Sequence, residues 1–464
     1  MSTLQARLRA HAAVPLYRSA YALMSSVAAT SALGFLFWAA ASRAYSAHAV
    51  GVSSAAIAAL TFLTGVGALF LDGVLYRFLP RAGEKTDALL RWAALATTVS
   101  AAAAATVFVA GVHVWAPDLS FIRSSPWTVF AAIGSVVVSC LLVVADGALI
   151  GFRRAGWVPI KGVAYGLAKV VVLLVCIHLV PRYGILLAWI TPSGIILAGS
   201  IYLVAARVAP TYRAKSDVEA EEIGPRIVAR YGAGNYVAFL CNLAYRTLPP
   251  LLVIHELGPT KSAYFYVPWQ ILISLVLLTN NLSVSLVVEG SLDPAQLALQ
   301  TRRALRQFIR LLLPISLVLL VAGPWVLEIF GPRYAAHGGS LLRLLALGLI
   351  PASISIIAIG VARVRGRVGV IIATQVSIAV VVVGLGAVFL RVVGLTGFGL
   401  SWLIAQTAAA WWLSLSELRP VLKPRLRQRR PVPPRIQTLE EDLAKFEQDL
   451  RDAFAWLDSP GRPS

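Results

Sequence analysis

The sequence predicts an all-α, polytopic membrane protein with twelve transmembrane helices in two six-helix lobes. Three observations lead to this fold class. The chain is 58 % hydrophobic and only 13 % charged, its mean hydropathy is +0.77, and long apolar segments recur along nearly its whole length. A helix needs about 20 apolar residues to cross about 30 Å of hydrocarbon. The composition therefore leaves little chain for a water-soluble domain.

Twelve apolar segments are long enough to span a bilayer, after an N-terminal stretch, residues 1–20, that we expect in the cytoplasm. The first segment is too long for a cleaved signal peptide and is followed by further spans. The expected spans are residues 21–42, 50–71, 92–115, 126–151, 158–180, 183–206, 228–254, 262–288, 308–330, 340–362, 368–390 and 394–416. Cys140, Cys176 and Cys241 all fall inside spans, which predicts neither a disulfide framework nor a metal-ligand pair.

Basic residues alternate between the two sides of these spans. One set of loops and ends carries 29 Lys and Arg residues, and the opposite set carries 7. Basic loops stay in the cytoplasm, so both termini are expected there. The net charge of +20 thus reflects the topology first. Contact of the basic loops with anionic lipid headgroups is a secondary interpretation. We expect no nucleic-acid partner.

The longest internal polar segment, residues 207–227, divides the spans into lobes at residues 21–206 and 228–417. Two short stretches support a duplication, because "PRYGILLAW" aligns with "GLTGFGLSW" and pairs Gly184 with Gly397 and Trp189 with Trp402. An even number of spans gives both repeats the same orientation, related by an axis along the membrane normal. We therefore expect the substrate path between the lobes.

Residues 418–464 form a cytoplasmic tail with a Pro- and Arg-rich linker and a short amphipathic helix. One apolar stripe recurs at spacings of three and four residues along the predicted helix, at Leu439, Leu443, Phe446, Leu450, Ala453 and Leu457. The helix either folds back on the cytoplasmic loops or serves as a partner or self-association helix.

Two neighbouring spans carry polar stripes, which are costly in lipid unless they face water or a partner. At 100° per residue, Asn235, Asn242 and Arg246 share one face of the seventh span. Gln270 and Asn281 lie on the polar flank of the eighth. The two stripes predict a water-accessible groove between these helices.

Arg246 stands just before Pro249 and Pro250, whose missing N–H groups leave the carbonyls of Tyr245 and Arg246 without their helical donors. Such a break is tolerated where it lines a cavity. The alternative is that Arg246 reaches toward the outer headgroups.

Lys169 lies near the centre of the fifth span, too far from either end to reach the headgroups. It is either functional or paired with a structural partner such as Asp146 on the fourth span. Asp146 itself is expected to pair with the nearby Arg153 and Arg154. No pattern typical of an enzyme, a cofactor site or a metal site occurs, so none is expected.

Three stretches resemble the polysaccharide transporter family, the flippases of lipid-linked oligosaccharides in the multidrug/oligosaccharidyl-lipid/polysaccharide exporter superfamily. They are "SALGFLFWAAASRAYSAHAVGVSSAAIAALTFLTGVGALFLDGVLYRFLP" from Ser31, "LIGFRRAGWVPIKGVAYGLAKVVVLL" from Leu149 and "YGILLAW" from Tyr183. The resemblance covers all twelve spans in their arrangement and about the first 200 residues in their amino-acid sequence. The tail lies outside the family pattern.

The resemblance implies the two-lobed fold shared with multidrug and toxic compound extrusion transporters, with a central cavity lined by spans one, two, seven and eight. It also implies cationic residues that bind the pyrophosphate of an undecaprenyl-linked sugar. The candidates here are Arg246, Lys169 and Arg43, although Arg43 ends the first span and is equally suited to anchor its outer edge.

The leading hypothesis is a flippase that moves a lipid-linked oligosaccharide across the bacterial cytoplasmic membrane by alternating access. An ion-coupled multidrug exporter of the same fold needs a buried carboxylate, and only Asp72 and Asp146 come near that role. A membrane-embedded polymerase or glycosyltransferase would need a larger outer loop than any predicted here.

Overall fold

The computed structural model describes residues 15–208, 225–292 and 296–422. Contacts group Met1–Arg419 into one compact unit and Pro420–Ser464 into another, and the description below concerns the first. The described residues are helical and contain no strand. The apolar stripe predicted between Leu439 and Leu457 lies outside the described residues.

In the described residues up to Val208 the chain forms seven α-helices, since the short helix α4 follows the second expected span. The bounds are α2 (Pro15–Ala44), α3 (Ala47–Gly67), α4 (Leu71–Phe78), α5 (Thr86–Trp115), α6 (Pro126–Gly151), α7 (Trp157–Leu179) and α8 (Gly184–Tyr202). Short 3-10 turns cover Leu79–Arg81, Gly83–Lys85 and Pro117–Arg123, and a π-helical turn, Leu203–Val208, continues α8.

The second half repeats this pattern with its own breaks. The bounds are α10 (Pro225–Thr247), α11 (Pro249–Leu257), α12 (Pro259–Leu292), α13 (Leu297–Glu328), α14 (Pro332–Val364), α15 (Val368–Val380), α16 (Gly386–Val393), α17 (Leu395–Leu413) and α18 (Arg419–Leu422). The π-helical segments Val381–Leu385 and Ser414–Leu418 join α15 to α16 and extend α17.

Local sequence explains where several helices begin. The Ser46 hydroxyl accepts a hydrogen bond from the backbone N–H of Ala49 and caps α3. Ser125 and Thr128 form a capping box at the start of α6. Proline occupies an N-terminal position of α6, α11 and α14, where its missing N–H costs nothing.

Nine helices of the described chain are long and apolar enough to cross a membrane, or ten if the bent pair formed by α10 and α11 counts as one span. The chain is therefore a multi-pass membrane protein. The helices α2 and α17, expected as the first and twelfth spans, are helical but fall outside this count. The number twelve thus stays a prediction.

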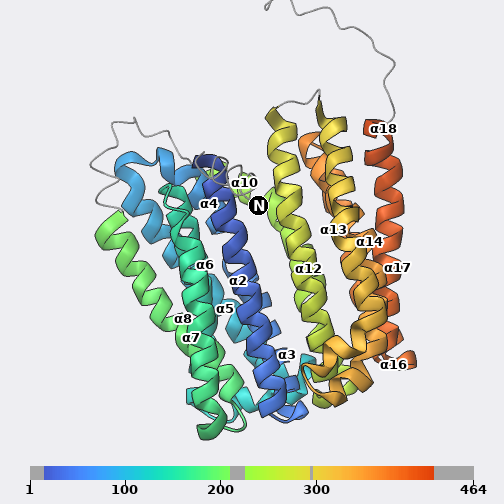
Figure 1. The fold of residues 1–464 in the computed structure, drawn as a ribbon. Helices are drawn as coiled ribbons and strands as arrows, with labels where there is room; N and C mark the ends of the chain where they lie inside the picture. Colours follow the sequence, from blue (N-terminus) through green and yellow to red (C-terminus); the bar gives the residue numbers. More distant parts are fainter. Residues whose placement is uncertain (1–14, 209–224, 293–295, 423–464) are drawn as a thin grey trace, which may run out of the picture. The chain divides into compact units, whose positions relative to one another are not determined.

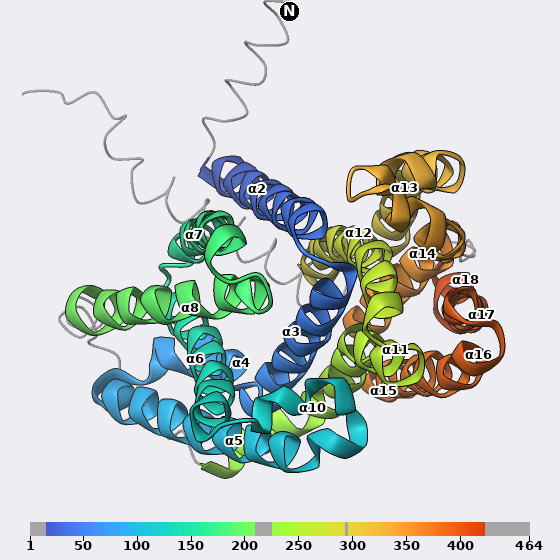
Figure 2. The ribbon, with the colours of Figure 1, turned by 90° about the horizontal axis from the view of Figure 1, so that it is seen from below.

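We call α2–α8 the first lobe and α10–α17 the second lobe. The helices α2 and α4–α8 lie at the left of Figure 1, and α12–α17 lie at the right. The most extensive contact between them joins α3 to α12, and α3 lies centrally in the perpendicular view of Figure 2. Gly51 makes this contact close, because a Cβ atom there would lie 1.8 Å from the carbonyl oxygen of Pro259. The two helices can pack at this distance only with glycine at that position.

Candidate functional site

A polar cavity with a volume of about 510 Å³ lies between the lobes. We call it the inter-lobe cavity. The helices α2, α7 and α8 of the first lobe and α12 and α13 of the second contribute to its wall, together with Phe330. Its polar and aromatic lining residues are Thr30, Ser31, Phe35, Trp38, Lys169, Trp189, Gln270, Ser274 and Phe330. Two predicted site residues, Lys169 and Gln270, therefore meet here from different lobes.

Lys169 is enclosed by aromatic rings. Its ammonium nitrogen lies 4.3 Å from the ring centroid of Trp189, 5.2 Å from that of Phe37 and 5.5 Å from that of Tyr165. The side chain is 8 % exposed, and it makes no ion pair or hydrogen bond within the described part of the chain. The ring faces stabilise the cation by cation–π attraction, which leaves its N–H donors available to a ligand.

Asp146, which was considered as the structural partner of Lys169, forms its ion pair with a different lysine. The Lys161 ammonium forms the ion pair with Asp146 and also donates to the carbonyl of Leu142. The expectation that Asp146 pairs with Arg153 and Arg154 is wrong for the same reason. Lys161 lies two turns before Lys169 on α7, which brings it level with Asp146 near one end of α6.

The second cavity, of about 570 Å³, lies largely within the second lobe, and we call it the second-lobe cavity. Its walls come from α10, α12, α14, α15 and α17, with Phe70 added from the first lobe. The polar lining residues are Asn242, Tyr245, Arg246, Asn280, Ser283, Ser355, Arg363, Gln375, Trp402 and Gln406. Among the described residues that line the cavity, the cationic ones are Arg246 and Arg363, and none is Asp or Glu.

Hydrogen bonds link the predicted stripe of α10 to α15. Arg246 donates to the side-chain oxygen of Asn242 at 3.4 Å. The Asn242 amide nitrogen donates to Gln375 at 3.2 Å and to the Tyr245 hydroxyl at 3.0 Å. Asn242 and Arg246 therefore share one cavity, on the same face of α10, as their four-residue spacing predicts.

The break after Arg246 is satisfied by a side chain from the next helix. α10 and α11 meet at a bend of 42°, and Pro250 cannot donate to the carbonyl of Arg246. The indole N–H of Trp269 on α12 donates to that carbonyl instead, at 3.0 Å. Trp269 is 1 % exposed, so this bond satisfies a polar group that would otherwise be unpaired away from water.

Arg43 lines neither of these cavities but a separate one of about 510 Å³, together with Ser42, Glu328 and Arg333. Its Nε donates to the carbonyl of Ile329 at 2.7 Å, and its terminal nitrogen donates to that of Glu328 at 3.4 Å. These carbonyls end α13, so Arg43 joins the end of α2 in the first lobe to the second lobe. Asn235 and Asn281 belong to α10 and α12, but their side chains lie outside the described residues.

Four residues that line these cavities were not predicted as site residues from the sequence: Gln375, Gln406, Arg363 and Trp38. Gln375 and Gln406 are 6 % and 3 % exposed and sit inside apolar spans, which is the signal that singled out Asn242. Arg363 was counted only as one of several cytoplasmic basic residues. Trp38 carries no sequence signal for a cavity, because a tryptophan in a span is equally common in a packed core.

No known protein-family model and no curated protein sequence matches the chain. The chain does match solved structures. An inward-facing multidrug resistance transporter of the MATE family, in the MOP superfamily, is 16 % identical with a TM-score of 0.64, covering 85 % of this chain and 95 % of that one. The lipid II flippase MurJ, in an inward closed conformation, is 15 % identical with a TM-score of 0.63, covering 86 % of each chain.

A third structure, a MOP superfamily transporter from Pyrococcus furiosus, is 14 % identical with a TM-score of 0.59, covering 87 % of this chain and 95 % of that one. At these identities the similarity shows a shared fold. The predicted fold class, an all-α membrane protein of the multidrug and toxic compound extrusion type, is confirmed.

Proposed function

We propose that the chain is a flippase of the MOP superfamily. It moves a lipid-linked oligosaccharide, carried on a polyprenyl pyrophosphate, from the inner to the outer leaflet of the bacterial cytoplasmic membrane. The observation that carries this proposal is the inter-lobe cavity, where Lys169, Trp38, Trp189 and Gln270 converge. Such a substrate presents sugar hydroxyls, apolar sugar faces and a phosphate charge. The cavity offers an amide, aromatic faces and an ammonium group to match them.

The position of the cavity suits alternating access. Lys169 belongs to the first lobe and Gln270 to the second, so rocking of the lobes changes the distance between the two halves of the site. The polyprenyl tail stays in lipid while the polar head passes between the lobes. Both chain ends face the cytoplasm in this proposal, where residues 418–464 are available to other polysaccharide-assembly proteins.

Transport by single-residue variants tests the role of the inter-lobe cavity. Lys169→Gln removes the charge inside the aromatic enclosure and should lower saccharide export at least tenfold, since a charge-assisted contact contributes about 1.5 to 3 kcal/mol. Lys169→Arg should retain part of the activity. Lys261→Gln, an exposed lysine at the start of α12, is the matched control.

Export is measured in a strain lacking its own flippase, with the amount of each variant in the membrane quantified alongside. Normal export by Lys169→Gln at normal abundance would remove the inter-lobe cavity from the mechanism.

An ion-coupled multidrug exporter is a second candidate, favoured by two carboxylates of the first lobe. The backbone of Asp72 packs against Gly147, next to Asp146 in the chain, and an exporter of this kind needs a protonatable or cation-binding carboxylate. Asp146 is already paired with Lys161, which weighs against it. Drug efflux that collapses with the proton or sodium gradient, and is lost in Asp72→Asn, would favour the exporter.

A further inference from the structure

We propose that the break between α3 and α4 is a conformational latch, which holds α10 of the second lobe against the first lobe and releases it when the lobes move. The latch consists of Val66 and Phe70 from the first lobe and Tyr236 and Phe239 from α10. It goes beyond the proposed function, because its parts contact one another and need no substrate. Val66 and Phe70 lie near the end of the second expected span that the basic loops place toward the cytoplasm.

The backbone of this break is held in a strained conformation. Leu69 and Phe70 have φ angles of 51° and 57°, in the left-handed region where a Cβ atom approaches the following carbonyl oxygen. Glycine avoids this approach, yet both positions carry large side chains. Such strain persists only where the surrounding structure enforces it, and it clusters at sites that switch between two states. The contacts that enforce it here include those that the latch makes with the second lobe.

The end of α3 is bound by a hydroxyl group from each lobe. Carbonyl groups at the end of a helix lack α-helical donors. The Tyr236 hydroxyl of α10 donates to the carbonyl of Val66 at 2.7 Å, and the Ser100 hydroxyl of α5 donates to the carbonyl of Gly67. Consecutive carbonyls of one helix end therefore bind different lobes. Movement of α10 away from α3 removes the first hydrogen bond and leaves the second in place.

The Phe70 ring makes the second contact of the latch with α10. Its centroid lies 6.0 Å from that of Phe239, whose ring stacks in turn on Tyr236 at 6.4 Å. The Phe70 ring also covers Gly73 of α4, where a Cβ atom would lie 2.5 Å from it. Among the described residues that line the second-lobe cavity, Phe70 alone comes from the first lobe. The strained residue thus carries the ring that reaches the second lobe.

The helix that follows the break is fixed to the first lobe. Gly147 of α6 packs on the Asp72 backbone, since a Cβ atom there would lie 2.6 Å from the Asp72 Cα atom. Gly151, one turn further along α6, packs on Leu75, because a Cβ atom there would lie 2.9 Å from the Leu75 carbonyl oxygen. Backbone contacts of this kind leave α4 no room to slide. The helix α4 therefore stays with α6, and the break is the place where the chain can bend.

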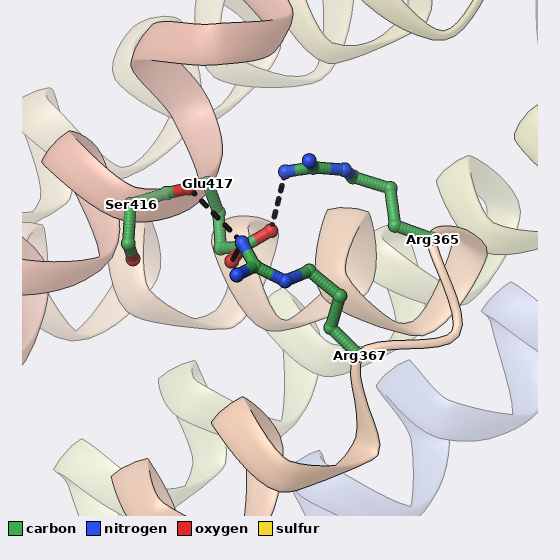
Figure 3. A network of polar contacts seen from close by, with 4 residues as sticks. All are labelled: Arg365, Arg367, Ser416 and Glu417. Atoms are coloured by element: carbon green, nitrogen blue, oxygen red, sulfur yellow. Dashed lines mark hydrogen bonds and ion pairs between the residues drawn. The ribbon is translucent and has the colours of Figure 1, made fainter.

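The C-terminal part of α10 is tied to the second lobe. Asn242 of α10 donates to Gln375 of α15. The turn before α15 is fixed to the end of α17, since Figure 3 shows Arg365 and Arg367 bound to Glu417. The Glu417 side chain is fully buried, which strengthens both ion pairs. The helix α10 therefore moves with the second lobe, and its contacts with the break must separate when the lobes move apart on this side.

Alkylation of a cysteine at Leu243 measures the release of the latch. The Leu243 side chain packs on Gly65 of α3, where a Cβ atom would lie 2.2 Å from it, so this site becomes accessible when α3 and α10 separate. Purified full-length protein that carries Leu243→Cys, with Cys140, Cys176 and Cys241 replaced by Ser, is reacted with a maleimide in nanodiscs. No saccharide is present, so failure of the latch and failure of the flippase proposal are distinguishable.

Two substitutions in the latch should change the alkylation rate in opposite directions. Tyr236→Phe keeps the ring and removes the hydroxyl, so it should raise the rate about three- to tenfold. Tyr202→Phe, the same change at an exposed tyrosine of α8, is the matched control. Leu69→Gly should lower the rate about threefold or more, because glycine accepts a positive φ without strain. Leu69 is 38 % exposed, so this change removes little packing.

A cysteine at Ala105 controls for general loosening of the protein, because Ala105 is buried within the first lobe. Its alkylation rate should be the same in all variants. The proposal is overturned if Tyr236→Phe reacts like Tyr202→Phe, or if Leu69→Gly reacts as fast as the protein that keeps Leu69. It is also overturned if Tyr236→Phe accelerates alkylation at Ala105→Cys as much as at Leu243→Cys.

Discussion

Trp269 shows how one side chain can repair a break that the sequence imposes. Pro249 and Pro250 remove two helical donors, and the Trp269 indole N–H restores one of them at the carbonyl of Arg246. Its ring packs edge-to-face against Phe398 and Trp402, with centroids 5.5 Å and 5.3 Å away. The hydrogen bond and the packing together hold the backbone that carries Arg246 at the wall of the second-lobe cavity.

Trp269→Phe separates these two contributions, because phenylalanine keeps an aromatic ring and loses the N–H. A buried carbonyl left unpaired costs about 1 to 3 kcal/mol, so the temperature of unfolding in detergent should fall by several degrees. Trp325→Phe makes the same chemical change at a residue that is 66 % exposed, and it should unfold like the wild type. Equal unfolding temperatures for the two variants would contradict the role given to the indole N–H.

Residue-level prediction succeeded where neighbours lie on one helix. Asn242 and Arg246 are one turn apart on α10, and helical periodicity placed them on the same face. The placement of Lys169 and Gln270 in one cavity, and the hydrogen bond from Asn242 to Gln375 in the other, depend on contacts between distant helices. A single sequence does not encode those contacts as a pattern, because an apolar span fits many neighbours equally well.

Breaks in the helices divide into those with a sequence signal and those without. The break between α10 and α11 was predicted from Pro249 and Pro250. The break between α3 and α4 was not, since it places Leu69 and Phe70 at positive φ angles of 51° and 57°, where side chains other than glycine are rare. Tertiary packing overrides the local preference there: Phe70 lines the second-lobe cavity.

The proposed internal repeat is consistent with the places of two aligned tryptophans. Trp189 on α8 lines the inter-lobe cavity, and Trp402 on α17 lines the second-lobe cavity. Each follows by five residues a glycine that is tightly packed near a helix start. A Cβ atom would lie 2.2 Å from the Tyr45 hydroxyl at Gly184 and 2.3 Å from the Phe389 carbonyl at Gly397. The aligned glycines are thus both tightly packed, one in each lobe.

Gly51→Ala tests the contact between α3 and α12. The added methyl group would overlap the carbonyl of Pro259 at 1.8 Å, and backbone atoms on both sides prevent a local adjustment. Overpacking of this kind costs about 1 to 3 kcal/mol, so the unfolding temperature should fall.

Gly134→Ala on α6 is the matched control for Gly51→Ala, because a Cβ atom there meets nothing within 4 Å. Replacing glycine by alanine inside a free helix face is neutral or stabilises by about 0.5 to 1 kcal/mol. If both variants unfold at the wild-type temperature, α3 and α12 are not held at the distance the structure shows.

The two lobes share a buried apolar cluster near the ends of α2, α12 and α13. It combines Phe37 and Trp38 of the first lobe with Tyr266 and Phe330 of the second, and the rings of Trp38 and Tyr266 lie 4.6 Å apart between centroids. The alternation of basic residues predicts that this end faces outward. The structure therefore corresponds to a state in which the lobes are packed together at the predicted outer end.

Arg43 adds a polar contact to this end of the molecule. Its guanidinium group binds the last carbonyls of α13, where the negative end of the helix dipole strengthens the interaction with a cation. Because the donor and the acceptors belong to different lobes, the contact exists only while the outer ends are together. Its loss should favour the state in which they separate.

Arg43→Gln should therefore increase the population with separated outer ends about tenfold, which corresponds to the loss of about 1.4 kcal/mol of charge-assisted hydrogen bonding. A cysteine at Ala263 reports this state, because Ala263 is fully buried in the shared cluster. In a background with Cys140, Cys176 and Cys241 replaced by Ser, an impermeant thiol reagent on intact cells should label Ala263→Cys faster when Arg43 is Gln. Arg43→Lys should have a smaller effect, because it keeps the charge.

Ala101→Cys controls for general loosening of the protein, since Ala101 is fully buried within the first lobe. Its labelling rate should not respond to Arg43→Gln, because separation of the lobes leaves contacts inside the first lobe intact. Labelling of Ala263→Cys only in inside-out vesicles would reverse the predicted orientation. An unchanged labelling rate at Ala263→Cys would show that Arg43 anchors the edge of the helix bundle without influencing how the lobes open. The comparison of Ala263→Cys with Ala101→Cys therefore separates a contact between the lobes from one within a lobe.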